Sequence, residues 1–360
     1  MRKLARVLVV ALCVALAVSA AGCKLPKSKA KKKVSTAADT SVQGDVTAYT
    51  SMPQDQADKY LAVFKKEYPN VNVTIVSDKP AAIAAKLVKE KKAPVADVVW
   101  HTPLSAVTAA EEASALASYS YHPGQIDAVD ANWTDGDHPD APLFTGVDAS
   151  LLSWAVNSSK TGGNSPATFR DLIDSKYSGM IAAPSINTDA GYTMVASLLS
   201  NMDETDGWKY LDQLDKNVTY YSDDQAAPAK DAAGGTVGIG IGFDNAVVAA
   251  ANSGSGVSAV FPGQPEMSPY DIDVDALVDK PAASTAAKTF LDWAIGDSAM
   301  GVYAADTPIT SVDEGNQPQG YPATISDQLM QAEDFSYLAA NHDKIVTEWM
   351  KRYGKKIKAQ

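Results

Sequence analysis

The sequence predicts an α/β fold in which two doubly wound lobes are joined by two crossing segments. Segments with the residue spacing of strands alternate with segments that have helical spacing, which is typical of an open, doubly wound sheet. A second alternating series starts near residue 153, and the chain later returns to the first series. We therefore expect the crossings near residues 145–152 and 258–268.

The first series occupies the N-terminal part of the folded chain. Its strands are short and β-prone, and its helices carry apolar residues at helical spacing. The predicted strands are 46–49, 71–76 and 97–100, and the predicted helices are 54–68, 80–91 and 104–116. Residues 44–147 therefore supply most of the first lobe.

The second series predicts a second lobe over residues 148–261. Its expected strands are 153–157, 180–184, 218–221 and 237–243, and its expected helices are 168–174, 191–201, 206–215, 225–233 and 245–253. Extended segments at 257–261 and 272–278 and a helix at 282–296 then return to the first lobe, so that residues 262–315 belong to it. Residues 316–360 are expected to form a C-terminal helical segment, with one or two helices over 326–353, that packs on the lobes.

The N-terminus has the pattern of a secretory signal over residues 1–22. Basic residues precede an apolar run at 7–18, which is too short to span a bilayer as a helix. Small residues before Cys23 resemble the lipobox of bacterial lipoproteins, although Ala20 stands where that motif usually has leucine. The resemblance implies that Cys23 becomes the lipidated first residue of the mature chain; the alternative is an ordinary signal peptide with Cys23 unmodified.

Residues 23–43 are predicted to be a flexible tether. Six lysines stand between residues 24 and 33 without an acidic residue, which favours a segment lying near anionic headgroups, or simply a solvated tail. The whole chain carries a formal net charge of −12, and its acidic body argues against nucleic acid as a partner. Because Cys13 lies in the signal, the mature chain would keep a single cysteine and no intramolecular disulfide.

Eight short motifs, taken in order, resemble one known family. They are 49–53 (YTSMP), 96–100 (ADVVW), 168–172 (TFRDL), 177–181 (YSGMI), 189–193 (DAGYT), 207–211 (GWKYL), 226–228 (AAP) and 238–244 (GIGIGFD). Together they are similar to the bacterial extracellular solute-binding proteins of the iron(III)/phosphonate/sugar-phosphate group, over nearly all of residues 44–312. The resemblance implies a periplasmic-binding-protein-like fold whose lobes close over a solute.

The loops that follow the predicted strands supply the candidate ligand contacts. In open α/β sheets a ligand binds beyond the carboxyl ends of the strands. The candidates are Thr50, Ser51, His101 and Thr102 in the first lobe, Ser185, Asn187, Thr188, Gly191, Ser222, Asp223, Asp224, Phe243 and Asp244 in the second, and Tyr270 and Asp271 past the second crossing.

Residues 185–191 are the first choice for binding an oxyanion. Hydroxyl groups and the free N–H groups of a helix N-terminus suit such a group. The alternative is that these residues only cap the helix. Asp223 and Asp224 could recognise a cationic end, as in an aminoalkylphosphonate, or could themselves be a cap and its solvated neighbour.

No metal or cofactor is predicted. Ferric members of the family hold iron with adjacent tyrosines after the glycine-rich strand, where this chain has Phe243 and Asp244. Tyr220 and Tyr221 are adjacent, but we expect them to pack in an extended segment. Carboxylates and phenolates would still suit Fe(III), so a ferric receptor stays an alternative.

The resemblance implies a transport function rather than catalysis. The sequence has no Gly-x-Ser-x-Gly elbow and no His-Glu-x-x-His motif, and its four histidines are dispersed. We therefore predict a monomeric binding component of an ABC importer, anchored to the outer face of the bacterial cell membrane, that hands its solute to membrane permease subunits. A phosphonate or phosphate ester is the preferred solute, and an exported hydrolase or an adhesin-like lipoprotein is the alternative from another class.

Overall fold

The computed structural model describes residues 38–121, 133–135, 138, 140–253, 256–263, 266–311, 318–323, 325–330 and 333–358. Residues 38–360 form one compact unit, which is the part discussed below. The predicted signal sequence, Cys23 and most of the tether lie outside the described residues. Among the described residues, no helix combines the length and apolar character needed to cross a membrane.

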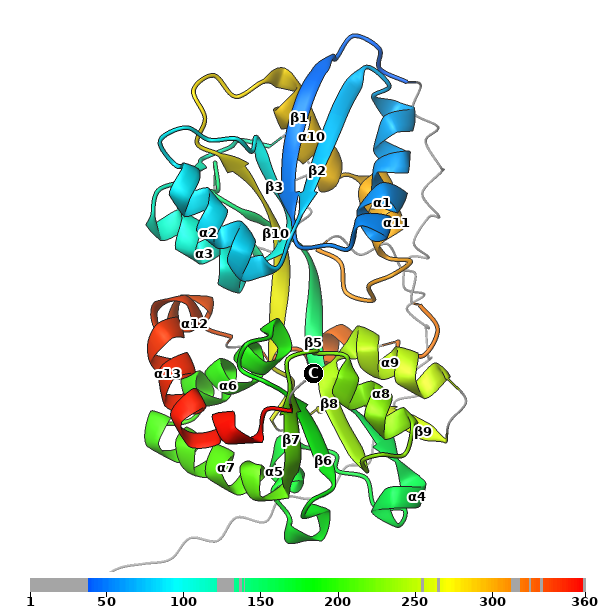
Figure 1. Cartoon of the computed structure of the whole chain (residues 1–360). Helices are drawn as coiled ribbons and strands as arrows, with labels where there is room; N and C mark the ends of the chain where they lie inside the picture. Colours follow the sequence, from blue (N-terminus) through cyan, green and yellow to red (C-terminus); the bar gives the residue numbers. More distant parts are fainter. Residues whose placement is uncertain are drawn as a thin grey trace, which may run out of the picture. The chain divides into compact units, whose positions relative to one another are not determined.

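Lobe 1 is an α/β layer structure around a mixed sheet (Figure 1). Strand β1 pairs in parallel with β2 and β3, and β10 joins β3 in the antiparallel sense. The strands are β1 (Gly44–Thr50), β2 (Val71–Ser77), β3 (Val98–Pro103), β4 (Leu116–Ala117) and β10 (Tyr270–Val278). The helices are α1 (Gln54–Glu67), α2 (Pro80–Glu90), α3 (Leu104–Glu112), α10 (Thr285–Ala294) and α11 (Asp297–Tyr303).

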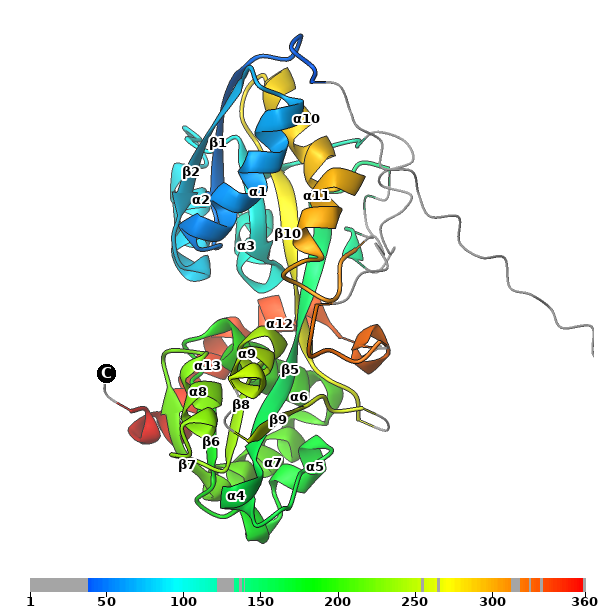
Figure 2. The ribbon, with the colours of Figure 1, turned by 90° about the vertical axis from the view of Figure 1, so that its right-hand side faces the viewer.

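The lobe 1 helices cover both faces of this sheet. Helices α2 and α3 lie together on one side, while α1, α10 and α11 lie on the other (Figures 1 and 2). Helix α1 shows why the local sequence folds this way, since Ala57, Tyr60 and Phe64 recur at helical spacing and are fully buried. The Ser284 hydroxyl caps α10 by accepting the Ala287 N–H.

Lobe 2 has a smaller sheet, which is also covered on both faces. Its strands are β6 (Ile181–Pro184), β7 (Val218–Ser222), β8 (Ile239–Phe243) and β9 (Val257–Val260). Its helical elements are α4 (Ser158–Thr161), α5 (Phe169–Leu172), η3 (Ser175–Tyr177), α6 (Asp189–Asn201), α7 (Glu204–Asn217), α8 (Ala227–Ala233) and α9 (Asp244–Asn252). The C-terminal elements are η4 (Ile325–Gln328), α12 (Phe335–Ala340), α13 (His342–Tyr353) and η5 (Gly354–Lys356).

Strand β5 (Thr145–Asn157) belongs to both lobes. Its first half pairs with β10, up to Leu151 opposite Tyr270. Its second half pairs with β8 from Leu152 opposite Phe243, and also with β9. The predicted crossing at 145–152 and the predicted strand at 153–157 are therefore one continuous strand. The reason is non-local, because the partner of the first half comes much later in the chain.

Separate hydrophobic cores define the two lobes, as the predicted fold class requires. The first core extends from Val46 to Leu151 and includes the returning strand β10 and helix α10. The second begins at Leu152 and includes Trp349 and Tyr353 of α13. A smaller cluster rich in alanine lies under α8 and α9 on the other face of the lobe 2 sheet. The prediction of two α/β lobes is confirmed.

Some predicted elements have different bounds in the structure. The helix expected at 282–296 is the shorter α10, which ends at Ala294, and a second helix that was not predicted, α11, begins at Asp297. The helix expected at 104–116 ends at Glu112, and Leu116 with Ala117 instead pairs with β10. After α3 the chain joins the sheet, and this non-local strand pairing is why the helical spacing alone did not show where the helix ends.

The glycine-rich strand β8 is explained by the close approach of α8. A Cβ atom at Gly240 would lie 2.0 Å from the carbonyl oxygen of Pro228, in the first turn of α8. The alternating residues Ile239 and Ile241 are fully buried in the second core. Glycine therefore lets the helix backbone pack directly against the strand.

We expect Gly240→Ala to destabilise the protein by about 1–3 kcal/mol or more, because the added methyl group meets backbone atoms that cannot rotate aside. Gly301→Ala in α11 is the matched control, since nothing lies within 4 Å of its added Cβ. A glycine-to-alanine change inside a helix should stabilise by about 0.5–1 kcal/mol. Urea unfolding measures both variants, and equal midpoints for the two would contradict this explanation.

Candidate functional site

A cleft of about 1030 Å³ lies between the lobes. Its lobe 1 wall is made by α2 and α3, and its lobe 2 wall by the β6–α6 loop together with the end of α12 and the start of α13. The charged and titratable side chains that line it are Lys89, Glu112, Asp189, His342, Asp343 and Lys344. A cleft of this size and mixed polarity is suited to a small polar molecule.

Three helix N-termini border the cleft. Pro80 and Ala81 open α2, Ser105 lies in the first turn of α3, and Asp189 is the first residue of α6; all four line the cleft. The first N–H groups of a helix have no partner within the helix, and the helix dipole places partial positive charge there. The cleft therefore has an anion-attracting feature on both walls.

The predicted residues Asn187 and Thr188 line this cleft. Thr188 is the N-cap of α6 and accepts the Gly191 N–H at 3.1 Å. The Asn187 side chain is held by its amide N–H bond to Asp223 Oδ1 at 3.0 Å, and the Ser185 hydroxyl donates to the same oxygen. Asp223 thus orders the loop that presents Asn187 to the cleft.

Gly191 allows this loop to pack on α6. A Cβ atom here would lie 1.8 Å from the carbonyl oxygen of Ser185, so the backbone of the loop touches the first turn of the helix. The adjacent Ala190 N–H donates to Gln225 Oε1 at 3.2 Å. Gly191 and Ser185 are fully buried and support the cleft wall from behind.

The Ser222–Asp224 stretch forms local turns held by side-chain hydrogen bonds. Ser222 Oγ accepts the Asp224 N–H at 3.1 Å, and Asp224 Oδ1 accepts the Ala226 N–H at 2.9 Å. Asp224 is exposed and lies 3.9 Å from the Lys230 ammonium group. These bonds precede α8, whose N-cap, Ala226, has no side-chain cap, and none of the three residues is among those that line the described cleft.

The predicted residues of the first lobe come together, but His101 and Thr102 lie within β3 and not in a loop after it, because the strand extends to Pro103. The hydroxyls of Thr50 and Ser51 donate to the carbonyl oxygen of His101 at 3.4 and 3.3 Å, and the Thr102 hydroxyl donates to the Trp100 carbonyl at 3.4 Å. His101 has φ of 51°, in the left-handed region that is costly for a side chain with a Cβ. This backbone conformation sets the ring within the sheet, where it is 2% exposed.

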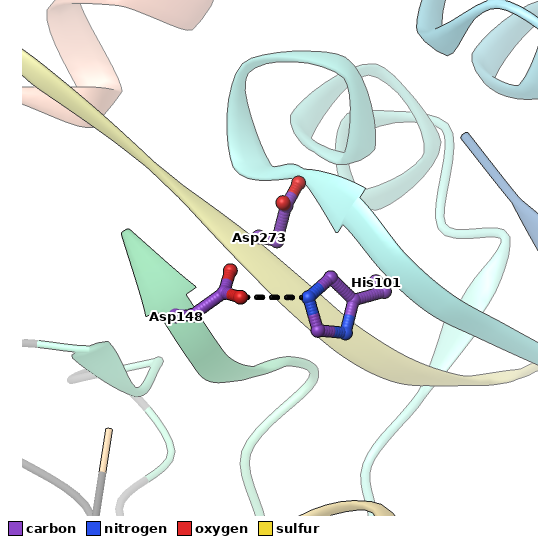
Figure 3. A group of neighbouring side chains, drawn as sticks. All are labelled: His101, Asp148 and Asp273. Atoms are coloured by element: carbon purple, nitrogen blue, oxygen red, sulfur yellow. Dashed lines mark hydrogen bonds and ion pairs between the residues drawn. The ribbon is translucent and has the colours of Figure 1, made fainter. Parts of the chain in front are cut away.

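The imidazole of His101 lies beside two carboxylates. Its Nε2 is 2.9 Å from Asp148 Oδ2, and Asp273 lies on the neighbouring strand β10 (Figure 3). The ring also packs against Tyr60 and Tyr303, with centroid distances of 5.9 and 4.8 Å. Burial by itself lowers the pKa of His101, but the negative charge of Asp148 and its neighbours raises this pKa to about 9.

Asp244 lies at the boundary between the lobes. It begins α9 directly after Phe243, is 1% exposed, and accepts the Leu151 N–H at 2.9 Å. Leu151 is the residue of β5 at which pairing passes from β10 to β8. Burial raises the pKa of Asp244 to about 7, with a Tyr321 hydrogen bond acting in the opposite direction.

Asp271 caps the helix that borders the cleft. It accepts the Ser105 hydroxyl at 2.7 Å and the Ile272 N–H at 2.9 Å, and burial raises its pKa to about 7. The ring of Tyr270 packs edge-on against Phe335 at 5.6 Å. Both residues are buried next to the cleft and are not among its lining residues in the described part of the chain.

Several lining residues were missed by the sequence analysis. Ser105 and Asp189 directly follow predicted loops, and extending each loop by a few residues would have found them. Asp189 is half-buried, and desolvation raises its pKa to about 6. His342 and Lys344 come from the α12–α13 region, for which the sequence carries no signal of a cleft position.

The adjacent tyrosines Tyr220 and Tyr221 point to opposite faces of β7. The Tyr220 phenol donates to Asp231, and the Tyr221 phenol donates to Asp215 Oδ1 at 3.2 Å. The Tyr221 ring is buried against Trp349 of α13. Within the described residues, neither phenol lines the cleft.

Two lobes with separate cores and a polar cleft between them define the class of two-lobed binding proteins. A family model described as "bacterial extracellular solute-binding protein" matches residues 93–298. The chain belongs to this family, whose members bind small solutes for uptake by ABC permeases. The resemblance read from the sequence motifs is confirmed.

Proteins similar to this chain differ in what their names say they bind. An uncharacterised protein of Haemophilus influenzae is 23% identical over 260 residues, which is 70% of this chain and 73% of that protein. The periplasmic binding protein AfuA of Actinobacillus pleuropneumoniae, solved with fructose-6-phosphate, is 22% identical with a TM-score of 0.73, over 87% of this chain and 99% of that one. The apo ferric ion-binding protein A of Pasteurella haemolytica is 15% identical with a TM-score of 0.73, over 88% and 99%. At these identities the likeness to the two structures shows the fold alone.

We expect Asp244→Asn to gain stability relative to wild type as pH rises from 5 to 8. Between about pH 4 and pH 7 the folded protein keeps a proton on Asp244 that the unfolded chain has released, so stability falls as pH rises through this window. Each pKa unit corresponds to about 1.36 kcal/mol, so the gain should be a few kcal/mol.

Chemical unfolding of both proteins at several pH values measures this difference, and other buried acids cancel because they are present in both. Asp55→Asn, at an exposed aspartate of α1, controls for the loss of a carboxylate in general. A difference between wild type and Asp244→Asn that stays constant from pH 5 to 8 would show that Asp244 is not held protonated by burial.

Proposed function

We propose that this protein captures a small solute bearing a phosphonate or phosphate-ester group in the interlobe cleft and delivers it to an ABC permease without chemical change. The observation that carries the proposal is the meeting of helix N-termini from both lobes at one cleft. Such termini are suited to an oxyanion because their dipoles and N–H groups favour negative charge. No cofactor is needed for this function.

The side chains around these termini support an anionic group on the solute. The Asn187 amide and the hydroxyls of Ser105 and Thr188 lie on the cleft lining and can serve as donors or exchange their internal bonds. Lys89 adds a positive charge to the same cleft, and Lys344 also lines it, with its ammonium group paired to Glu204 at 2.8 Å. Because these groups come from both lobes, a solute that contacts them all would stabilise closure about the β5 and β10 crossing.

The carboxylates of the cleft support a solute with donors at its other end. Glu112, Asp189 and Asp343 accept hydrogen bonds when ionised, and sugar hydroxyls or an ammonium group would supply them. A cleft of about 1030 Å³ also exceeds what inorganic phosphate alone would fill. AfuA, with fructose-6-phosphate, shows that this fold can accommodate a sugar phosphate.

A ferric receptor is less well supported by the cleft. The phenols of Tyr220 and Tyr221 hydrogen-bond to Asp231 and Asp215 away from it, and Tyr192, which lines it, donates its hydroxyl to the Leu338 carbonyl. Phenolate ligands for Fe(III) are therefore engaged elsewhere among the described residues. Fe(III) citrate is nevertheless included in the test below because similar structures contain iron.

We expect a phosphonate or phosphate-ester solute to raise the melting temperature of the protein. At a solute concentration of 100 times the dissociation constant, the free energy of unfolding should increase by about 2.7 kcal/mol. The panel contains fructose-6-phosphate, an aminoalkylphosphonate, inorganic phosphate and Fe(III) citrate. Native mass spectrometry of gently purified protein identifies any solute that co-purifies. A shift with Fe(III) citrate alone would overturn the proposed solute class.

The variant Asn187→Ala should weaken binding of the active solute by about tenfold, because a hydrogen bond to a charged group contributes about 1.5–3 kcal/mol. Asn245→Ala is the matched control, since Asn245 is exposed on α9 in the same lobe and is not among the lining residues. Isothermal titration calorimetry measures both. Equal affinities in the two variants would place the binding site away from the β6–α6 loop.

We further propose that lipid on Cys23 holds the protein, as a monomer, at the outer face of the bacterial cell membrane, with residues 23–43 as the tether. Replacing Cys23 by serine should move the protein from the membrane fraction to the soluble fraction, because the acyl chains would be lost. Cys13→Ser, inside the predicted signal, is the matched control. Retention of Cys23→Ser in the membrane fraction would contradict lipid anchoring at this residue.

A further inference from the structure

Three side chains from three strands of lobe 1 converge on one point. They are His101 of β3, Asp148 of β5 and Asp273 of β10, and one potential ligand atom of each lies within 4.8 Å of the other two (Figure 3). His101 and Asp148 are 2% and 1% exposed, whereas Asp273 is half-buried. The group therefore has two ligands fixed in the interior and a third nearer the surface.

Strand pairing forces the two carboxylates together. Asp148 and Asp273 are directly opposite each other in the antiparallel β5–β10 ladder, and the register shifts immediately after Asp273. Like charges directly opposite on neighbouring strands are destabilising. A third buried carboxylate, Asp275, accepts the His101 backbone N–H at 2.8 Å and so lies next to the same group.

Asp148 has an oxygen that its neighbours leave unsatisfied. Its Oδ2 is bonded to His101 Nε2 at 2.9 Å and accepts the Thr307 hydroxyl at 2.8 Å. Its Oδ1 is buried without a hydrogen-bond partner among the described residues, and so is Oδ2 of Asp275. A buried carboxylate oxygen without a donor is costly, and a bound cation would offset this cost.

We propose that His101, Asp148 and Asp273 bind a divalent first-row transition-metal ion such as Zn²⁺ or Mn²⁺. One imidazole nitrogen with two carboxylates is a donor set that these ions accept, whereas Mg²⁺ and Ca²⁺ prefer oxygen ligands alone. Bonds of about 2.0–2.2 Å require ligand atoms no more than about 4.4 Å apart, so small side-chain rotations would complete the site. The partly exposed Asp273 marks the side from which the ion enters.

None of the three proposed metal ligands is among the residues that line the cleft in the described part of the chain, although the charge of the lining residue Asp189 acts on Asp273. The His101 ring packs against Tyr60 of α1 and Tyr303 of α11, whereas the cleft follows α2 and α3 on the other side of the sheet. All three ligands belong to lobe 1, so the ion is not cargo held between lobes. The bound ion would link β3 to β5 and β10, the two strands of the crossing, and would make that crossing more rigid.

The test uses the purified protein after dialysis against a chelator, with ZnCl₂ and MnCl₂ as probes. Isothermal titration calorimetry should show that wild type binds one metal ion per chain with high affinity. Crystals grown with the ion should give an anomalous difference peak between the three side chains. The variants His101→Gln and Asp273→Asn should each bind the ion with at least tenfold lower affinity. Near-ultraviolet circular dichroism confirms that each variant is folded, and the partly exposed Asp273 keeps the test available if the buried His101 variant does not fold.

His138→Gln is the matched control, because His138 also pairs with an aspartate, Asp135, at 2.7 Å but is 53% exposed. Its affinity for the ion should equal that of wild type. The proposal fails if wild type shows no stoichiometric binding, or if Asp273→Asn binds the ion as tightly as wild type. Solute binding is measured separately on protein that has been dialysed against a chelator. A failure to bind the metal ion therefore leaves the solute proposal unaffected, and a failure to bind the solutes leaves the metal proposal unaffected.

Discussion

A single strand that must satisfy two sheets is the constraint on which the rest of the structure depends. Strand β5 pairs with β10 up to Leu151 and with β8 from Leu152, so the two cores meet at one peptide unit. At that point the Leu151 N–H is accepted by Asp244, which is the first residue of α9. A side-chain carboxylate therefore replaces a ladder partner where the strand changes sheets, and both lobes are oriented from this position.

Buried acids gather around the same crossing. Asp148 of β5 and the alternating aspartates of β10 lie close to Asp244 and His101, and burial raises the pKa of Asp271, Asp275 and Asp244 to about 7. Such groups cost stability unless they are protonated, paired or bound to a cation. The crossing therefore carries a group of buried acids in addition to the carboxylates that line the cleft.

The cleft depends on this arrangement without sharing its residues. Its walls contain the N-terminal turns of helices and the β6–α6 loop, and the two walls belong to lobes with separate cores. The β5 and β10 crossing determines how the two walls face each other. Asp271 links the two features, because it stands on β10 and caps α3 through Ser105. A change at the crossing can therefore alter the cleft through the position of α3.

The alternation of strands and helices, the division into two lobes and the loop of Asn187 and Thr188 could be predicted from the sequence, because each follows from local spacing or from a strand running into a capped helix. The sequence placed Asp244 directly after a strand, but it put His101 and Thr102 in a loop although they lie within β3, and it could not say that these side chains point inward. Only the tertiary structure decided that β5 is one strand, that α12 and α13 reach the cleft, and that Asp148 faces Asp273. Each of these depends on pairing between residues far apart in the chain, whose register is set by the packing of whole lobes and leaves no periodic trace in the local sequence.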